Sequence, residues 1–266
     1  MKSDATPMFD SHSHLQMAVF AGDLPEVLER ARQEGLEGAV VIGMDPPSSQ
    51  QAIDLANRYE RVYATVGVHP HDASCLDPYA LQSLREMAHQ PGVVAIGETG
   101  LDFYRNLSPA TIQRRAFRDQ LALADEMDLP VVIHSRQANE ATLRMLREWA
   151  GQKQRKQPIG VLHCFMGDAE LAAEYVRLGF MLSFAGNVTY PNARRLQNAV
   201  AAVPLEGLLV ETDCPFLAPQ SHRGRRCEPL YLRETIELIA GLRGVDTGEV
   251  AAATTVNAKK LYRLES

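Results

Sequence analysis

Short apolar runs rich in valine and isoleucine recur along the chain. They are MFDSHSHL (8–15), GAVVIG (38–43), VYATVGVHP (62–70), VVAIGETGLD (93–102), PVVIHSR (130–136), IGVLHCF (159–165), FMLSFAG (180–186) and LLVETDCP (208–215). Continuous hydrophobicity over such short runs is typical of strands buried on both faces of a parallel sheet. The pattern therefore predicts eight buried parallel strands.

Amphipathic stretches of helical period separate most of these runs. In DLPEVLERARQEG (23–35) the apolar positions are Leu24, Val27, Leu28 and Ala31, and a glycine follows. A helical region over about 229–264 completes the chain. Eight strands alternating with helices in 266 residues predict an α/β fold, a single (β/α)8 TIM-type barrel over residues 1–266, in preference to an open doubly wound sheet.

Polar residues stand at or just after the ends of seven of the eight predicted strands. They are His12, His14, His69, Glu98, Asp102, His134, His163, Asn187 and Asp213. The carboxyl ends of barrel strands converge on one rim, where active sites form. The other three histidines, His71, His89 and His222, stand elsewhere in the pattern. The rim is therefore the predicted functional site.

Six of these residues are suitable ligands for a divalent ion. Alternation along the first strand places His12 and His14 on one face, with Asp10 pointing the same way. The predicted ligands are His12, His14, Glu98, His134, His163 and Asp213. Six exceed what one tetrahedral ion needs, so they predict two ions with Glu98 as the bridge. Two ions that activate water indicate hydrolysis.

Composition limits the classes of protein to which the chain can belong. No run of 18 apolar residues and no secretory signal are present, so a cytoplasmic protein without a membrane span is expected. Four cysteines without a CxxC pair predict neither a zinc ribbon nor a disulfide framework. Cys164 and Cys214 each follow a proposed ligand, so alternation predicts core thiols there.

A net charge of −6 disfavours broad coating of nucleic acid but allows a local basic pocket. The loop SHRGRRC (221–227) holds the one compact basic cluster, Arg223, Arg225 and Arg226, and arginine suits phosphate oxygens. A solvated charge run is the alternative for this loop. Phe103 and Tyr104 are candidates for stacking a base or for packing in the core.

Six motifs together resemble the TatD-type family of metal-dependent deoxyribonucleases, within the wider amidohydrolase-like metal barrels. They are DSHSHL, GVHPH, GETGLD, PVVIHSR, HCF and ETDCP, in the order and spacing of that family, over residues 8–264. The resemblance implies a (β/α)8 barrel, two divalent ions (Mg, Mn or Zn) and hydrolysis of phosphodiesters.

The resemblance also implies a role for each motif residue. His12 and His14 would bind one ion, His134 and His163 the second, and Glu98 would bridge them. Asp213 would ligate the first ion and orient or deprotonate the attacking water, and His69 would contact substrate phosphate. These residues stand in the matching motifs.

The chain departs from the family pattern at two positions. Thr99 stands beside Glu98 where an apolar residue or cysteine is expected, and Cys227 stands where the pattern after the last strand has asparagine. Neither is a proposed ligand, so the departures concern substrate preference. The sequence also lacks a lysine on the fourth strand, which argues against a carbamylated-lysine bridge.

The expected function is a metal-dependent phosphodiesterase or deoxyribonuclease that trims nucleic-acid ends, with DNA single strands or ends as substrate. Arg223 and Arg225 are the expected phosphate contacts, and Asp213 and Glu98 the expected catalytic residues. The alternatives are hydrolysis of another ester or amide, such as a lactone, a small phosphoester or an aminoacyl ester, and a non-catalytic metal-binding module.

Overall fold

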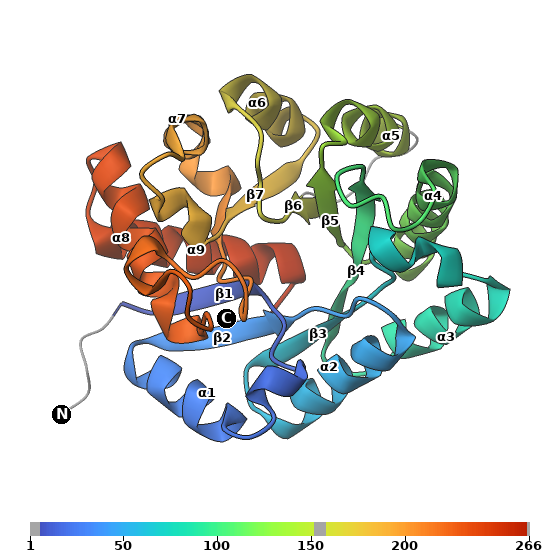
Figure 1. The fold of residues 1–266 in the computed structure, drawn as a ribbon, viewed down its shortest axis with the longest axis horizontal. Coiled ribbons are helices and arrows are strands. Elements are labelled where there is room, and N and C mark those ends of the chain that lie inside the picture. The colour runs from blue at the N-terminus through green and yellow to red at the C-terminus, as the bar shows by residue number, and fades with distance from the viewer. Residues whose placement is uncertain (1–5, 152–157, 265–266) are drawn as a thin grey trace.

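The computed structural model describes residues 6–151 and 158–264, and its strands form a ring surrounded by helices (Figure 1). The strands are β1 (Met8–Ser13), β2 (Leu36–Val41), β3 (Val62–Val66), β4 (Val93–Asp102), β5 (Val131–Arg136), β6 (Gly160–Leu162), β7 (Phe180–Phe184) and β8 (Leu208–Val210). Each pairs in parallel with the next along the chain. The ring closes where Asp213 N–H donates to His12 O at 2.9 Å and His14 N–H donates to Cys214 O at 2.8 Å. The predicted barrel is confirmed.

The helices cover the outside of this ring. They are α1 (Leu24–Gln33), α2 (Pro46–Arg58), α3 (Pro78–Ala88), α4 (Ala110–Met127), α5 (Asn139–Gly151), α6 (Ala169–Arg177), α7 (Arg194–Ala202), α8 (Leu232–Arg243) and α9 (Thr247–Tyr262). Local signals start several of them. Asp45, for example, accepts the Ser48 N–H at 2.8 Å and caps α2 before a proline at the first helical position. None of the helices in the described ranges is long and apolar enough to cross a membrane.

Two hydrophobic cores hold the layers together. The larger lies between the strands and the outer helices, and the smaller fills the inside of the barrel, with Phe9, Val40, Val161 and Leu209 among its members. Leu261 and Tyr262 of α9 join the inner core, and Tyr262 Oη–H donates to Ser11 O at 2.9 Å. Because apolar side chains fill this inner region, the polar residues of the strand ends lie beyond it, at the carboxyl end of the barrel.

Six of the predicted strands run past the observed carboxyl ends. β1 ends at Ser13, β2 at Val41, β3 at Val66, β6 at Leu162, β7 at Phe184 and β8 at Val210. His14, His69, His163 and Asp213 therefore lie in the segments that follow the strands. Cys164 and Asp213 have positive φ values of 42° and 53°, and a left-handed backbone does not continue a strand.

Glycine allows β4 and β5 to approach closely beside the site. Gly100 is paired with His134 and has φ +140°, and a Cβ there would collide with the backbone oxygen of His134. The register also shifts between Ile96 and Thr99, around Glu98. This irregular segment of β4 positions the Glu98 carboxylate against the histidines of neighbouring strands.

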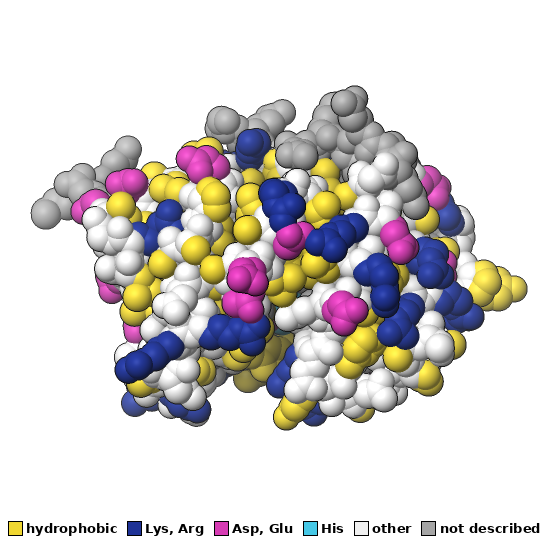
Figure 2. Space-filling view, turned by 90° about the horizontal axis from the view of Figure 1, so that it is seen from above, with side chains coloured by type: hydrophobic (Ala, Val, Ile, Leu, Met, Phe, Trp, Pro, Cys, Tyr) yellow, Lys and Arg dark blue, Asp and Glu magenta, His cyan; other side chains and the backbone are white. Residues whose placement is uncertain are grey.

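The side of the barrel differs in chemistry from its rim. Figure 2 shows acidic and basic side chains interspersed with apolar ones on this face, and no histidine is visible there. The histidines of the strand ends are instead buried, and they include His12, His14, His69 and His163.

Candidate metal centre

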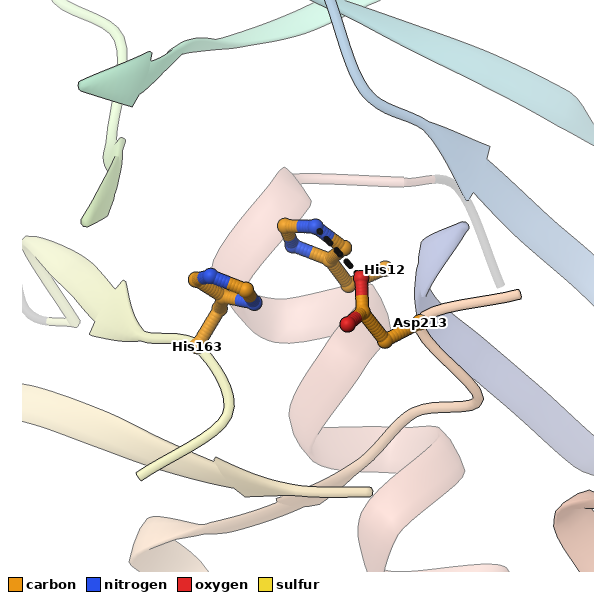
Figure 3. Close-up of side chains that lie close together, drawn as sticks. All are labelled: His12, His163 and Asp213. Carbon is orange, nitrogen blue, oxygen red and sulfur yellow. Dashed lines mark ion pairs between the residues drawn. The ribbon is translucent and has the colours of Figure 1, made fainter. Parts of the chain in front are cut away.

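The histidines of β1 and its following loop face each other at the carboxyl end of the barrel. His12 Nε2 and His14 Nε2 are 3.3 Å apart, and both side chains are buried. Asp213 Oδ1 lies 3.6 Å from His12 Nε2 and 3.3 Å from His14 Nε2. Figure 3 shows His12, His163 and Asp213 converging from three segments of the chain. His12 and His14 therefore lie together, as predicted, but His14 does so from the loop after β1 and not by alternation within the strand.

Glu98 lies between this group and a second pair of histidines. Its Oε2 is 3.5 Å from His12 Nε2, whereas its Oε1 is 3.0 Å from His134 Nδ1 and 2.8 Å from His163 Nε2. The two oxygens of one carboxylate therefore face two different sets of imidazole nitrogens. This is the arrangement expected of a bridging ligand.

The chemistry of these donors fits divalent cations. Donor atoms lie within 4.8 Å of one another in three groups: His12, His14 and Glu98; His12, His163 and Asp213; His69, Glu98 and His134. Imidazole nitrogens and carboxylate oxygens are the ligands preferred by zinc and similar ions. Burial alone would raise the pKa of Glu98, but the surrounding histidines hold it well below its ordinary value. Burial alone would likewise raise the pKa of Asp213, but His14 and His12 lower it below its ordinary value, so both carboxyls are ionised.

A buried carboxylate supports His134 from behind. Asp102 Oδ2 accepts His134 Nε2–H at 3.0 Å and His71 Nε2–H at 2.9 Å, and Asp102 itself is fully buried. Burial would raise the Asp102 pKa, but His134, a backbone N–H and His71 lower it. A carboxylate behind a metal-binding histidine fixes the tautomer of the ring. With Nε2–H held by Asp102, the Nδ1 of His134 is directed at Glu98.

His163 also has a carboxylate behind it. Glu211 is fully buried, and its Oε1 accepts the Cys164 N–H at 2.7 Å and lies 3.4 Å from His163 Nδ1. Sequence reasoning missed this residue, although it stands two positions before Asp213 in the ETD motif. It also missed His71, whose ring contacts Asp102 and whose backbone N–H donates to His69.

Comparison with known proteins identifies the family. The family model described as TatD related DNase matches residues 9–263. The chain belongs to the TatD related DNase family. The metal-dependent hydrolase YabD of Bacillus subtilis is 42% identical over 257 residues, which is 97% of this chain and 99% of that protein. The 3'-5' ssDNA/RNA exonuclease TatD of Klebsiella pneumoniae is 39% identical over 97% of this chain and 98% of that protein.

A solved structure shows the same fold. The crystal structure of YJJV, a TatD homologue from Escherichia coli K12, superposes with a TM-score of 0.90 at 29% identity, covering 97% of this chain and 98% of that one. The barrel and the TatD-type resemblance drawn from the sequence motifs are both confirmed.

His69, of the TatD-type motif GVHPH, lies deep in the centre. Its Nδ1 accepts the backbone N–H of His71 at 3.1 Å, so Nε2 carries the proton of the neutral ring, 3.4 Å from Glu98 Oε1. Burial lowers the pKa of His69 to about 4, although Glu98 acts in the opposite direction. The lowered pKa keeps the His69 ring neutral. Contact between His69 and substrate phosphate stays a prediction.

The basic loop of this family member divides into two parts. Arg223 and Arg225 are exposed, and the Arg223 guanidinium lies 4.7 Å from the centroid of the Tyr190 ring. Arg226 instead donates to Asp23 at 2.6 Å and to Glu228 at 2.7 Å. Its charge is paired within the chain, so Arg223 and Arg225 are the residues of this loop that remain candidates for phosphate.

The two departures from the TatD pattern and the thiol beside the site have local explanations. Thr99 Oγ1 is buried and accepts Gln120 Nε2–H at 2.8 Å, while Cys227 is buried with its Sγ 3.8 Å from Thr212 O. Cys214 is a fully buried core thiol, as predicted. Cys164, also predicted to be a core thiol, is only half-buried. Because β6 ends at Leu162 and β8 at Val210, both thiols lie after their strands, where alternation does not apply. Burial and nearby carboxylates raise the Cys164 pKa, which keeps it a neutral thiol.

Asp10 is not part of the ligand set. It accepts Thr212 N–H at 3.0 Å and the Thr212 hydroxyl at 2.5 Å. Burial raises the pKa of Asp10 to about 7, against the lowering effect of these hydrogen bonds. Because Thr212 precedes Asp213, Asp10 ties β1 to the segment that carries the Asp213 carboxylate.

Proposed function

We propose that this chain is a divalent-metal-dependent phosphodiesterase that removes nucleotides from the ends of single-stranded nucleic acid, with DNA as the main substrate. The observation that carries the proposal is the position of Glu98, whose two oxygens face two separate sets of histidines. The TatD of Klebsiella pneumoniae, named as a 3'-5' ssDNA/RNA exonuclease, matches this chain across nearly its whole length and supports the choice of substrate.

Two divalent ions, Mg, Mn or Zn, would be held by the six ligands. His12, His14 and Asp213 would hold the first, His134 and His163 the second, and Glu98 would contact both. Such a pair of ions, when bound, lowers the pKa of water and neutralises charge on the attacking and leaving oxygens of a phosphodiester.

The chain's own residues supply the remaining steps. Asp213 is ionised and is the group that accepts the proton of the attacking water. His69 carries a proton on Nε2, deep in the centre, and would donate it as a hydrogen bond to a phosphate oxygen. Arg223 and Arg225 are exposed on the loop after β8 and would contact phosphates further along the strand.

The proposal is tested on protein stripped of metal and reloaded with Mg, Mn or Zn in turn. Single-stranded DNA, single-stranded RNA and duplex DNA, labelled at either end, are offered beside a lactone and a phosphomonoester. We expect metal-dependent release of mononucleotides from single strands, and its loss in Asp213→Asn. Hydrolysis of the lactone or the phosphomonoester without any release of nucleotides would contradict the proposal.

A further inference from the structure

Exposed hydrophobic side chains gather on the loops that follow the carboxyl ends of the strands. Val19 follows β1, Tyr104 and Leu107 follow β4, Met166 follows β6, and Phe216 follows β8. Scattered exposed apolar residues are normal on a protein surface. A group of them at the same rim as the candidate metal centre indicates a surface that a ligand covers. Two of the five are aromatic.

Phe216 stands at the edge of the centre. Its ring centroid lies 5.9 Å from that of His14, the two rings are inclined by 70°, and the side chain is 47% exposed. The Phe216 N–H donates to Asp213 O at 2.9 Å, so the turn that aims the proposed catalytic carboxylate also places this ring. An open aromatic face therefore lies next to the Asp213 side of the site.

Tyr104 occupies a comparable place beside the other half of the centre. Its N–H donates to Asp102 Oδ1 at 3.0 Å, and Asp102 in turn holds His134. The Tyr104 side chain is 55% exposed, and the Arg136 guanidinium lies 4.1 Å from its ring centroid. Arg136 stands two residues after His134, at the end of β5. An aromatic ring and a cation thus lie together at this point of the rim.

The two rings lie across the barrel from each other. Phe216 follows β8, which adjoins β1, whereas Tyr104 follows β4, four strands away in a ring of eight (Figure 1). Arg136 ends β5, the strand next to β4. A phosphodiester joins two nucleosides, so a phosphate at the centre carries one base toward each side. Aromatic rings that stack bases and arginines that contact phosphates are the usual elements of single-strand binding sites.

We infer that Phe216 and Tyr104 each stack on an unpaired nucleobase, one on either side of the scissile phosphodiester, with Arg136 contacting the adjoining phosphate. The inference rests on the proposed nuclease function and names the residues that select its substrate. A base in a duplex already has both faces stacked, so two such rings favour strand ends whose bases are free.

The experiment uses single-stranded DNA in which one nucleotide at a time, counted from the cleaved end, is replaced by an abasic residue. Stacking on one base is worth about 5-fold to 150-fold in binding, so the wild-type chain should lose kcat/KM in that range at two neighbouring positions. Phe216→Ala should abolish the loss at one of these positions and leave the other unchanged. Tyr104→Ala should do the reverse, and Phe216→Trp should keep both losses.

A matched control is Leu242→Ala, which removes an exposed apolar side chain from the last turn of α8, at the end of that helix remote from the rim. It should behave as the wild type. Metal content and circular dichroism check that each variant is intact, and Phe216→Leu replaces the alanine variant if that fails to fold. If the Phe216 and Tyr104 variants lose kcat/KM at both abasic positions as the wild type does, the stacking inference is wrong, while the nuclease proposal stands. A chain that cleaves no strand with any metal would overturn the nuclease proposal as well.

Discussion

Changing Asp102 to asparagine should weaken metal binding without removing any proposed ligand. Asp102 Oδ1 accepts the N–H groups of Tyr104 at 3.0 Å and Arg105 at 2.7 Å, so an asparagine oxygen should occupy that position. The amide NH2 would then replace Oδ2, which now accepts the Nε2–H groups of His134 and His71 at 3.0 and 2.9 Å. A donor facing His134 Nε2 favours the tautomer protonated at Nδ1, and that tautomer has no lone pair for an ion on the Glu98 side.

The loss of a carboxylate behind a metal-binding histidine typically lowers affinity by about 10-fold to 100-fold. We expect Asp102→Asn to weaken the affinity of one ion by that factor, measured by competition with a chelator of known affinity. Nitrogen-15 spectra of His134 should show the proton moving from Nε2 to Nδ1. The control is Asp54→Asn, because Asp54 is exposed on α2, away from the centre, and accepts a hydrogen bond from Gln50. Affinity within twofold of the wild type, with the His134 tautomer unchanged, would refute this reasoning.

Three further outcomes follow from the site. His12→Ala combined with His14→Ala should remove about one metal equivalent per chain and leave the fold intact, because rim residues serve function more than stability; unchanged metal content by elemental analysis would count against the assignment. Asp213→Asn should lower turnover on single-stranded DNA by about 10²- to 10⁴-fold at saturating metal, and near wild-type turnover would show that Asp213 is not the base. Arg223→Ala and Arg225→Ala should each lower the slope of log affinity against log salt by about 0.7 on a single strand with metal content unchanged, whereas parallel salt curves would leave the loop without a phosphate contact.

The barrel could be predicted because each strand carries its own signal. The run 93–102 coincides with β4. Its apolar residues come first and are typical of a strand buried in a parallel sheet, and its polar residues follow toward the carboxyl end of the strand. The convergence of His12, Glu98, His134 and Asp213 follows from the barrel itself, because strands of one direction end at one rim.

Contacts between separate loops could not be predicted from local spacing. His71 follows β3 and Asp102 ends β4, and only the folded chain brings their side chains to 2.9 Å. The three arginines of SHRGRRC are equivalent in sequence, but Asp23 of the segment before α1 pairs with Arg226 alone among them. Such pairings depend on residues far apart in the chain, and periodicity carries no information about them.

The central claim is that two ions share the Glu98 carboxylate. Anomalous X-ray scattering from crystals of the manganese- or zinc-loaded protein tests it most directly, because each bound ion gives its own peak. We expect two peaks, one on either side of Glu98, the first beside His12, His14 and Asp213 and the second beside His134 and His163. A single peak, or a second peak that does not contact Glu98, would contradict it.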